Sequence, residues 1–311
     1  MADEVLTYSE DAGLAREVAA AGSEVAAALG GEAAAVEPDE PPAGGPAAGK
    51  TVVAKGGRKI RGDEDAMVSA LAEIAKARHA KAVLVASTRS GRAVGARVAA
   101  RLRVGSLGTA KRLGVDAGRL VATREVYGGK FVARVAARLP CVAMVQPGAY
   151  QPRPVAGSRV EEEKVSLGES RVRTLEVREK PSGTVDLRTA QIIVSAGRGF
   201  SKREDLALAE GLARSLGAAL GCSRPLSSDL GWLGEERHIG LTGVYVHPRL
   251  YVAVGISGQL QHVAGIKDSK TIVAINNDKQ APIFQAADYG IVGDLYQVVP
   301  ALTKLLGRPA E

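Results

Sequence analysis

Short apolar runs alternate with alanine-rich segments through the first hundred residues of the chain. The runs have the length of strands, and they are residues 4–9, 32–36, 51–56 and 81–87. The segments between them carry apolar residues at helical spacing, and they are residues 13–31, 63–80 and 90–104. Strands that alternate with helices predict βα units and a parallel sheet.

From residue 105 onward the pattern changes to strand after strand. The strands predicted here are residues 118–128, 130–139, 141–147, 158–167 and 171–180. We therefore expect antiparallel strands to be mixed into the parallel sheet of this region. The next segment, residues 179–190, is polar and contains Pro181 and Gly183, which interrupt regular structure. We place the domain boundary there and predict an N-terminal α/β domain at 1–185 and a second domain at 190–311.

A second apolar nucleus begins with a buried strand at residues 191–196. Ser201 and Glu204 have the spacing of a capping box for the helix that follows. That helix should bury one apolar face, formed by Leu206, Ala209, Leu212 and Leu216. Further strands and a last helix at 295–307 complete an open parallel-sheet α/β domain. The fold class is thus α/β in two domains, with a mixed sheet in the first.

Composition and charge narrow the possible classes of protein. Hydrophobic residues make up 46% and charged residues 24%, which is ordinary for a globular protein. The net charge is +7, but the basic residues are spread along the chain, so we do not expect nucleic-acid binding. Cys141 and Cys222 lie in unrelated segments without C-x-x-C spacing, so we expect buried thiols rather than a disulfide or a metal pair. The start resembles no signal peptide and no segment is apolar enough to span a bilayer, so we expect a cytoplasmic protein without membrane insertion.

Two turns of the second domain combine glycine or serine with arginine. Arg198 lies between Gly197 and Gly199 where a strand leads into a helix, a place where backbone N–H groups can bind a phosphate. The alternative is a plain tight turn with a surface arginine. Ser223 and Arg224 follow another predicted strand, at the sheet edge where open α/β sheets bind ligands. There the alternative is a capping serine and a solvated arginine.

The stretch 252–276 reads as strand, tight turn, short helix and strand, but it lacks the glycine fingerprint of dinucleotide-binding proteins. Ser257 and Gly258 would face a phosphate or polyol, and Gln261 and His262 follow one helical turn later. A hydrogen-bond donor there would stabilise a ring that becomes anionic on reduction. The alternative is a core histidine that a carbonyl satisfies.

Three more polar residues are weaker candidates. Thr242 lies between glycines, and His238 and His247 near it suggest no metal set. Asn276 and Asp294 end two strands, where amides and carboxylates contact adenine and ribose. Asp294 has an alternative role as the N-cap of the last helix.

In this order the segments resemble the α subunit of electron transfer flavoproteins. The stretch 250–306 resembles that family's C-terminal signature almost throughout, and "GRG", "SRP" with "DLGW", and "TG" precede it in the family's order. The resemblance implies a noncovalently bound FAD in the second domain. By position, the residues that it implies for FAD binding are Arg198, Ser223, Arg224, Ile239, Gly240, Leu241, Thr242, Ser257, Gly258, Gln259, Leu260, Gln261, His262, Asn276, Asp294 and Leu295.

The resemblance also implies roles and partners. Arg224, Thr242 and His262 would lie beside the flavin ring, and Asn276 and Asp294 would bind the adenosine end. A β subunit carrying AMP or a second FAD would complete a heterodimer. Donor dehydrogenases, such as the acyl-CoA type of fatty acid oxidation, would deliver electrons, and a quinone reductase or another acceptor would receive them. No side chain is expected to act as a catalytic acid, base or nucleophile.

Some features depart from the family and leave alternatives open. Leu241 stands where many members carry a polar glutamine, and "YGGK" at 127–130 replaces a common pattern. An electron-bifurcating complex that oxidises NADH, with the second flavin in the β subunit, is one alternative. A pyridine-nucleotide oxidoreductase and a nucleotide-binding structural subunit without redox activity are the others.

Overall fold

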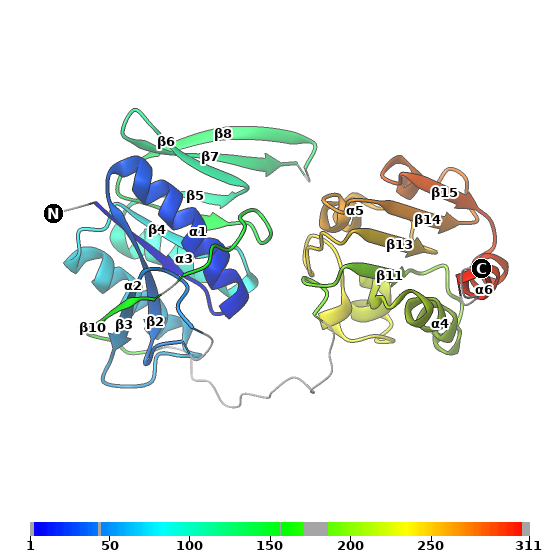
Figure 1. The fold of residues 1–311 in the computed structure, drawn as a ribbon, viewed down its shortest axis with the longest axis horizontal. Helices are drawn as coiled ribbons and strands as arrows, with labels where there is room; N and C mark the ends of the chain where they lie inside the picture. Colours follow the sequence, from blue (N-terminus) through cyan, green and yellow to red (C-terminus); the bar gives the residue numbers. More distant parts are fainter. Residues whose placement is uncertain (1–2, 43–44, 128, 156, 171–185, 307–311) are drawn as a thin grey trace. The chain divides into compact units, whose positions relative to one another are not determined.

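The computed structural model describes residues 3–42, 45–127, 129–155, 157–170 and 186–306. The chain divides into two compact units, Met1–Arg178 and Glu179–Glu311 (Figure 1), which are described separately. The two-domain α/β class is confirmed. The domain bounds 1–185 and 190–311 stay a prediction, and the strand predicted at 171–180 lies outside the described residues.

The first unit is built on a seven-stranded sheet in the order β10-β3-β2-β1-β4-β9-β5, in which every neighbouring pair is parallel. Its strands are β1 (Glu4–Tyr8), β2 (Glu32–Pro38), β3 (Lys50–Lys55), β4 (Ala82–Ala86), β5 (Gly105–Ala110), β9 (Cys141–Val145) and β10 (Arg159–Lys164). Its helices are α1 (Ala12–Leu29), α2 (Glu64–Ala77) and α3 (Arg89–Leu102).

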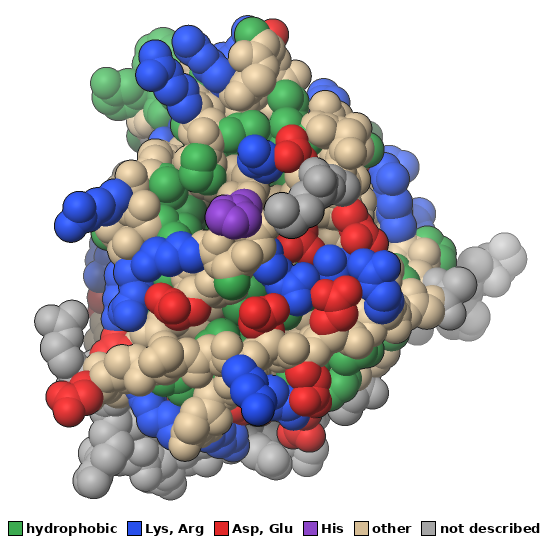
Figure 2. Space-filling view, turned by 90° about the vertical axis from the view of Figure 1, so that its left-hand side faces the viewer, with side chains coloured by type: hydrophobic (Ala, Val, Ile, Leu, Met, Phe, Trp, Pro, Cys, Tyr) green, Lys and Arg blue, Asp and Glu red, His purple; other side chains and the backbone are tan. Residues whose placement is uncertain are grey.

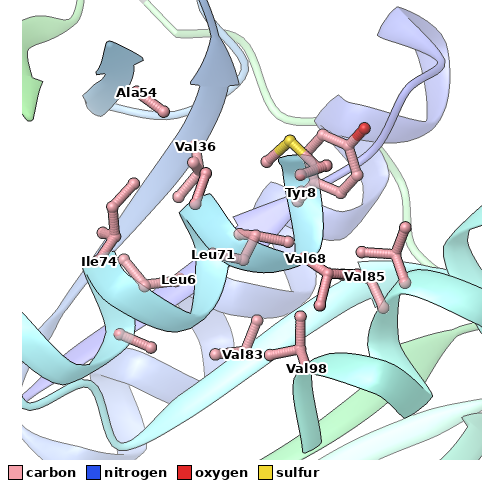
Figure 3. Close-up of a cluster of buried hydrophobic side chains, with 14 of the residues drawn as sticks. Leu6, Tyr8, Val36, Ala54, Val68, Leu71, Ile74, Val83, Val85 and Val98 are labelled. Atoms are coloured by element: carbon pink, nitrogen blue, oxygen red, sulfur yellow. The ribbon is translucent and has the colours of Figure 1, made fainter. Parts of the chain in front are cut away.

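The helices bury both faces of this sheet. On one face Leu71 and Ile74 of α2 and Val98 of α3 pack on Leu6 and Val83 of the strands (Figure 3). On the other face α1 and a second, smaller sheet cover the strands. Burial on both sides explains why the parallel strands read as continuous apolar runs. On the face drawn in Figure 2, basic and acidic side chains are interspersed.

The antiparallel strands form their own sheet and do not enter the parallel one. This sheet contains β6 (Arg112–Asp116), β7 (Arg119–Val126) and β8 (Phe131–Arg138). The domain therefore contains both parallel and antiparallel strands, but the prediction that they share one mixed sheet is wrong. Leu120 and Ala122 of β7 are buried in the core that α1 shares with the parallel sheet, while β8 alternates between exposed and half-buried positions. Such alternation is typical of a sheet with one face in water.

The second unit has a five-stranded parallel sheet in the order β12-β11-β13-β14-β15. Its strands are β11 (Ile192–Ala196), β12 (Ala219–Cys222), β13 (Leu250–Val254), β14 (Ile272–Asn276) and β15 (Tyr289–Val292). Its α-helices are α4 (Leu206–Leu216), α5 (Leu260–Ile266) and α6 (Leu295–Leu306), with short turns η1 (Arg203–Asp205), η2 (Pro225–Asp229), η3 (Glu235–Arg237) and η4 (Pro282–Gln285). The strand order reverses between β11 and β13, and ligands of doubly wound sheets bind at such a point.

The start of α4 differs from the prediction. The capping box of Ser201 and Glu204 is not formed, because the turn η1 precedes the helix and its N-cap, Asp205, makes no side-chain cap bond. The main-chain N–H of Ser201 donates instead to the Tyr296 hydroxyl at 2.8 Å. The predicted apolar face is confirmed, since Leu206, Ala209 and Leu212 are buried and Leu216 packs against them.

Candidate functional site

A cleft of about 960 Å³ opens at the carboxyl edge of the five-stranded sheet. This volume is at the upper end of the ~300–1,000 Å³ range of small-molecule and cofactor sites. The predicted residues that line it are Arg198, Ser223, Arg224, Ile239, Leu241, Thr242, Ser257, Gln259, Gln261, His262, Asn276, Asp294 and Leu295. Gly240, Gly258 and Leu260 were also predicted but do not line it.

The glycines after β11 and β13 bring two loops together at the switch point. The N–H of Gly199 donates to the Gly255 carbonyl at 2.9 Å. A Cβ at Gly197 would lie 2.4 Å from the same oxygen, and one at Gly199 would lie 2.7 Å from the Gly255 Cα. These glycines therefore permit close packing of backbone on backbone, whereas the sequence suggested only the approach of a ligand.

Gly258 is required for a different reason. Its φ of +85° is in the left-handed region, and a Cβ there would lie 2.2 Å from the Ile283 nitrogen. The N–H of Ile283 donates to the Ser257 carbonyl at 3.0 Å, so the turn η4 closes over this loop. Gly258 thereby holds the exposed Ser257 at the cleft without lining it.

Two guanidinium groups face the cleft without a protein partner. Arg198 follows β11 and Arg224 follows β12, and both are exposed. Neither guanidinium group makes a hydrogen bond or an ion pair with any residue that the structure describes. Ser223 is buried beside them, and its N–H donates to the Ala196 carbonyl at 2.9 Å. The plain tight turn and the solvated arginine do not explain why two free cations converge on one cleft.

The loop after η3 reaches the cleft by pairing with the start of α5. The N–H of Leu241 donates to the Gln261 carbonyl at 2.7 Å, and the φ of Gly240 is +148°. A Cβ at Gly240 would lie 2.9 Å from that carbonyl oxygen, so only glycine allows the approach. Leu241 is 43% exposed at the cleft, an apolar side chain among polar ones. Thr242 next to it is also exposed.

His262 is buried at the wall of the cleft, with 7% of its surface exposed. Its Nε2 and the Tyr251 hydroxyl are 2.9 Å apart. Its Nδ1 has no hydrogen-bond partner among the described residues, although the Ile239 carbonyl is near enough to oppose the loss of a proton. Burial, the largest cause, and the nearby His238 together lower the pKa of His262 to about 4. The ring is thus neutral near pH 7. The expected carbonyl partner is replaced by the Tyr251 hydroxyl, which satisfies only Nε2.

Asn276 and Asp294 already serve the protein itself. The Asn276 side chain donates to the Ile256 carbonyl and accepts from the Asp278 N–H, each at 2.9 Å. Asp294 accepts from the Tyr296 N–H at 2.9 Å and acts as the N-cap of α6. Both still line the cleft, so a contact with adenosine stays a prediction for each.

The sequence did not identify several residues of the cleft. They are Gly199, Ser201, Pro225, His238, Gly255, Ile256, Asn277, Asp278, Ala281, Pro282 and Tyr296. Asn277 and Asp278 directly follow Asn276 at the end of β14, so the rule that polar residues after a strand line the ligand edge could have identified them. Tyr296 had no such signal: its hydroxyl accepts from Ser201 and donates to Asp205 at 2.6 Å, a contact between distant segments.

The chain matches two domains of one family. The electron transfer flavoprotein domain matches residues 9–170, and the electron transfer flavoprotein FAD-binding domain matches residues 186–267. Protein FixB of Escherichia coli strain K12 is 39% identical over 233 residues, which cover 73% of this chain and 74% of FixB. The FixB proteins of E. coli strains 55989 / EAEC and SMS-3-5 / SECEC give the same values. The chain belongs to the electron transfer flavoprotein family. These matches confirm the predicted role as the α subunit of this family with FAD as cofactor.

The cleft fits FAD on three features of the second unit. Its volume suits a large cofactor. Two unpaired guanidinium groups suit an anionic cofactor, because a guanidinium group can bind two phosphate oxygens at once and a cation also stabilises a ring that gains electrons. The buried Nδ1 of His262 still requires a partner. We take these groups as the ones that would hold the cofactor.

One solved structure is only distantly similar to this chain. A solved structure from Mycobacterium smegmatis, assigned to thiamin diphosphate-dependent enzymes, aligns with 84% of this chain and 51% of its own, at 13% identity and a TM-score of 0.26. A likeness at that level carries no argument. Over the residues described, no helix is long and apolar enough to cross a bilayer, and no three metal-binding side chains cluster. Cys141 and Cys222 are buried and free, as predicted.

Proposed function

We propose that the cleft of the second unit holds FAD, which supplies the redox chemistry, and that the chain acts as an electron carrier. Arg198 and Ser223 would bind the diphosphate, and Ser257 would hold the middle of the cofactor. Arg224, Thr242 and His262 would lie beside the ring. Asn276 and Asp294 would border the adenosine end.

The observation that carries this proposal is the pair of unpaired cations, Arg198 and Arg224, at the switch point of a parallel sheet. A fixed positive charge near a group that gains electrons stabilises its reduced state. In a cleft that is partly shielded from water, such an interaction is stronger than in bulk solvent. The same cations attract an anionic cofactor.

The histidines of the cleft support a carrier rather than an acid–base enzyme. Burial is the largest cause of the lowered pKa values of His238 and His262, which keep both rings neutral near pH 7. We infer that neither works as a general acid or base in a chemical step on substrate. The protein would supply position, burial and charge to the flavin.

The partners follow from the family. We propose a heterodimer with a β subunit that carries AMP or a second FAD. Dehydrogenases, including the acyl-CoA type, would reduce the bound flavin, and a quinone reductase or another acceptor would oxidise it. We place the protein in the cytoplasm, and its two free buried thiols support a reducing compartment.

The proposal is tested by purifying the full chain with the subunit that accompanies it, and then counting flavin and nucleotide per heterodimer. One FAD and one AMP are expected for a simple carrier. Two flavins would favour the bifurcating alternative. A colourless complex that takes up no FAD on addition would overturn the carrier proposal and leave a nucleotide-binding subunit without redox activity.

A further inference from the structure

His238 is held at the wall of the cleft by its own loop. Its carbonyl accepts from the Val244 N–H at 2.8 Å, and its backbone forms a parallel bridge with Cys222, the last residue of β12. A Cβ at Gly243 would lie 2.8 Å from the His238 Cγ, so the turn closes directly against the imidazole. The residue is 5% exposed and lines the cleft. The ring thus has a fixed position that only a glycine at 243 permits.

Three titratable or charged groups face this ring, each from a different element. Glu235 of η3 has an Oε2 3.9 Å from the His238 Nδ1. Arg224, at the end of β12, and His262, of α5, interact with it electrostatically. The Cys222 thiol, whose backbone pairs with His238, has its pKa raised to about 12 by burial and stays neutral.

The balance of these groups depends on what the cleft contains. Burial is the largest effect and lowers the pKa of His238, Glu235 opposes it, and Arg224 lowers the pKa further. A negative charge in the cleft would offset Arg224 and favour the protonated ring. His238 is therefore neutral when the cleft carries no added negative charge, and it is poised to gain a proton when one appears.

We propose that His238 takes up a proton from water when the flavin held in the cleft gains an electron. One N–H bond forms on the imidazole as one O–H bond of a hydronium ion in the solvent breaks, and the electron comes from the donor that reduces the flavin. The positive ring then compensates the added negative charge. This inference rests on the proposed function, because it requires a flavin in this cleft.

The proposal sets the pH dependence of the reduction potential. Below both pKa values of His238 the ring is protonated in either redox state, and above both it is neutral in either state, so His238 adds no slope there. Between them reduction takes up a proton, and the potential falls as the pH rises. The limit is tenfold in the reduction equilibrium per pH unit, which is about 59 mV for one electron.

The direct test is nuclear magnetic resonance of the full complex with ¹³C-labelled histidine. The chain has only four histidines, so substitutions assign the signals of this subunit in the complex. The His238 signal is titrated with the flavin oxidised and then with it reduced by dithionite. We expect a higher pKa in the reduced complex by at least one pH unit, a tenfold change. An unchanged pKa would overturn the proposal.

A second test compares potentials from pH 5 to pH 9 in the wild type, in His238→Gln and in His247→Gln. His247 is exposed and does not line the cleft, so its variant is the matched control. We expect His238→Gln to lose part of the slope and to have the lower potential at acid pH, and His247→Gln to follow the wild type. Equal slopes in all three would refute the role of His238. A wild type without bound flavin would instead refute the proposed function, so the two failures are distinguishable.

Discussion

The two units of the molecule treat charged side chains in opposite ways. In the first unit, charged residues are brought together and neutralise one another. Lys50 donates to Glu4 at 2.6 Å, and Arg78 lies 2.9 Å from Glu161 and 2.8 Å from Glu163. The Lys50 and Arg78 side chains are only 11% and 15% exposed. This cluster joins the edge strand β10 to β3 and β1.

In the second unit, the cations Arg198 and Arg224 have no protein partner among the described residues, and the imidazoles are kept neutral by burial. The carboxyl edges of the two sheets show the same contrast. In the first unit the Ser87 and Thr109 hydroxyls bond to each other at 2.7 Å, and Asp39 accepts from two backbone N–H groups. In the second, hydroxyls and guanidinium groups face an open cleft.

The comparison shows that the same kind of sheet edge can differ in its availability to a ligand. Where the polar groups bond to one another, the edge is closed; where they have no protein partner, it is open to a ligand. Paired charges contribute to stability, because removal of one of them leaves its partner buried without a counter-charge. Unsatisfied charges contribute little to the fold and are available to a ligand. Substitutions should therefore separate the two units: those in the first should change stability, and those in the second should change binding.

The largest expected effect is in the charge cluster of the first unit. Arg78→Met leaves Glu163 without its cation and removes one of the cations beside Glu4 and Glu161. Loss of one partner from a mostly buried ion pair costs about 3 kcal/mol. Hydrogen exchange of β3 and β10 measures the loss. Lys76→Met, which removes an exposed pair with Glu73 on the same helix, should cost no more than about 0.5 kcal/mol. Equal losses of stability in the two variants would show that the charge cluster stabilises the fold no more than an exposed ion pair does.

The next effect is a pH dependence confined to the second unit. The folded pKa of His262 is about 4 and its unfolded value is near 6.5, so between these values the unfolded chain binds a proton that the folded chain does not. Stability should fall as the pH falls, by about 3 kcal/mol from pH 7 to pH 4. Trp232, the only tryptophan, reports on this unit during urea unfolding.

The matched variant for this prediction is His262→Gln, which cannot take up the proton. Between pH 7 and pH 4 this variant should lose about 3 kcal/mol less stability than the wild type does. His247→Gln, an exposed histidine, should behave as the wild type does. Parallel pH profiles for His262→Gln and the wild type would mean that His262 is not the group that limits acid stability.

A smaller effect is expected when the unpaired cations are removed. Arg198→Ala or Arg224→Ala loses charge-assisted bonds to the cofactor, which are worth about 1.5–3 kcal/mol, or about 10- to 100-fold in FAD affinity. Stability without FAD should change by less than about 0.5 kcal/mol. We also expect Arg224→Ala to lower the flavin potential. Flavin fluorescence titration and redox titration measure these effects.

A third arginine of the same region is the control. Arg237 donates to the Leu220 carbonyl at 3.0 Å, so it does have a protein partner. Arg237→Ala should therefore reduce stability more than FAD affinity, opposite to Arg198→Ala. If all three variants lose stability alike, the distinction between paired and unpaired cations in this unit is wrong.

The sequence was sufficient for features that depend on short-range patterns. Period and turn residues located most of the parallel strands but missed β5 (Gly105–Ala110). Residues that follow strands, such as Arg198 and Arg224, could be expected at one edge. It was not sufficient where two distant segments decide the outcome. The Tyr296 hydroxyl takes the Ser201 N–H that the capping box would have used, and no local signal announces this. The antiparallel strands form a separate layer because Leu120 and Ala122 are buried against α1 and the parallel sheet, a contact between segments that are distant in the sequence.

The smallest effect concerns Asp294, at which the two kinds of role meet. As the N-cap of α6 it resembles the satisfied groups of the first unit, and as a residue of the cleft it resembles the open ones. Asp294→Ala should cost about 1 kcal/mol, as loss of a cap does. Asp294→Asn keeps a capping oxygen, so stability measured by Trp232 fluorescence should be retained. If Asp294 also binds the ribose hydroxyls of FAD, its carboxylate is needed and the asparagine variant should bind FAD several-fold less tightly. Unchanged FAD affinity in Asp294→Asn would assign this residue to the helix alone.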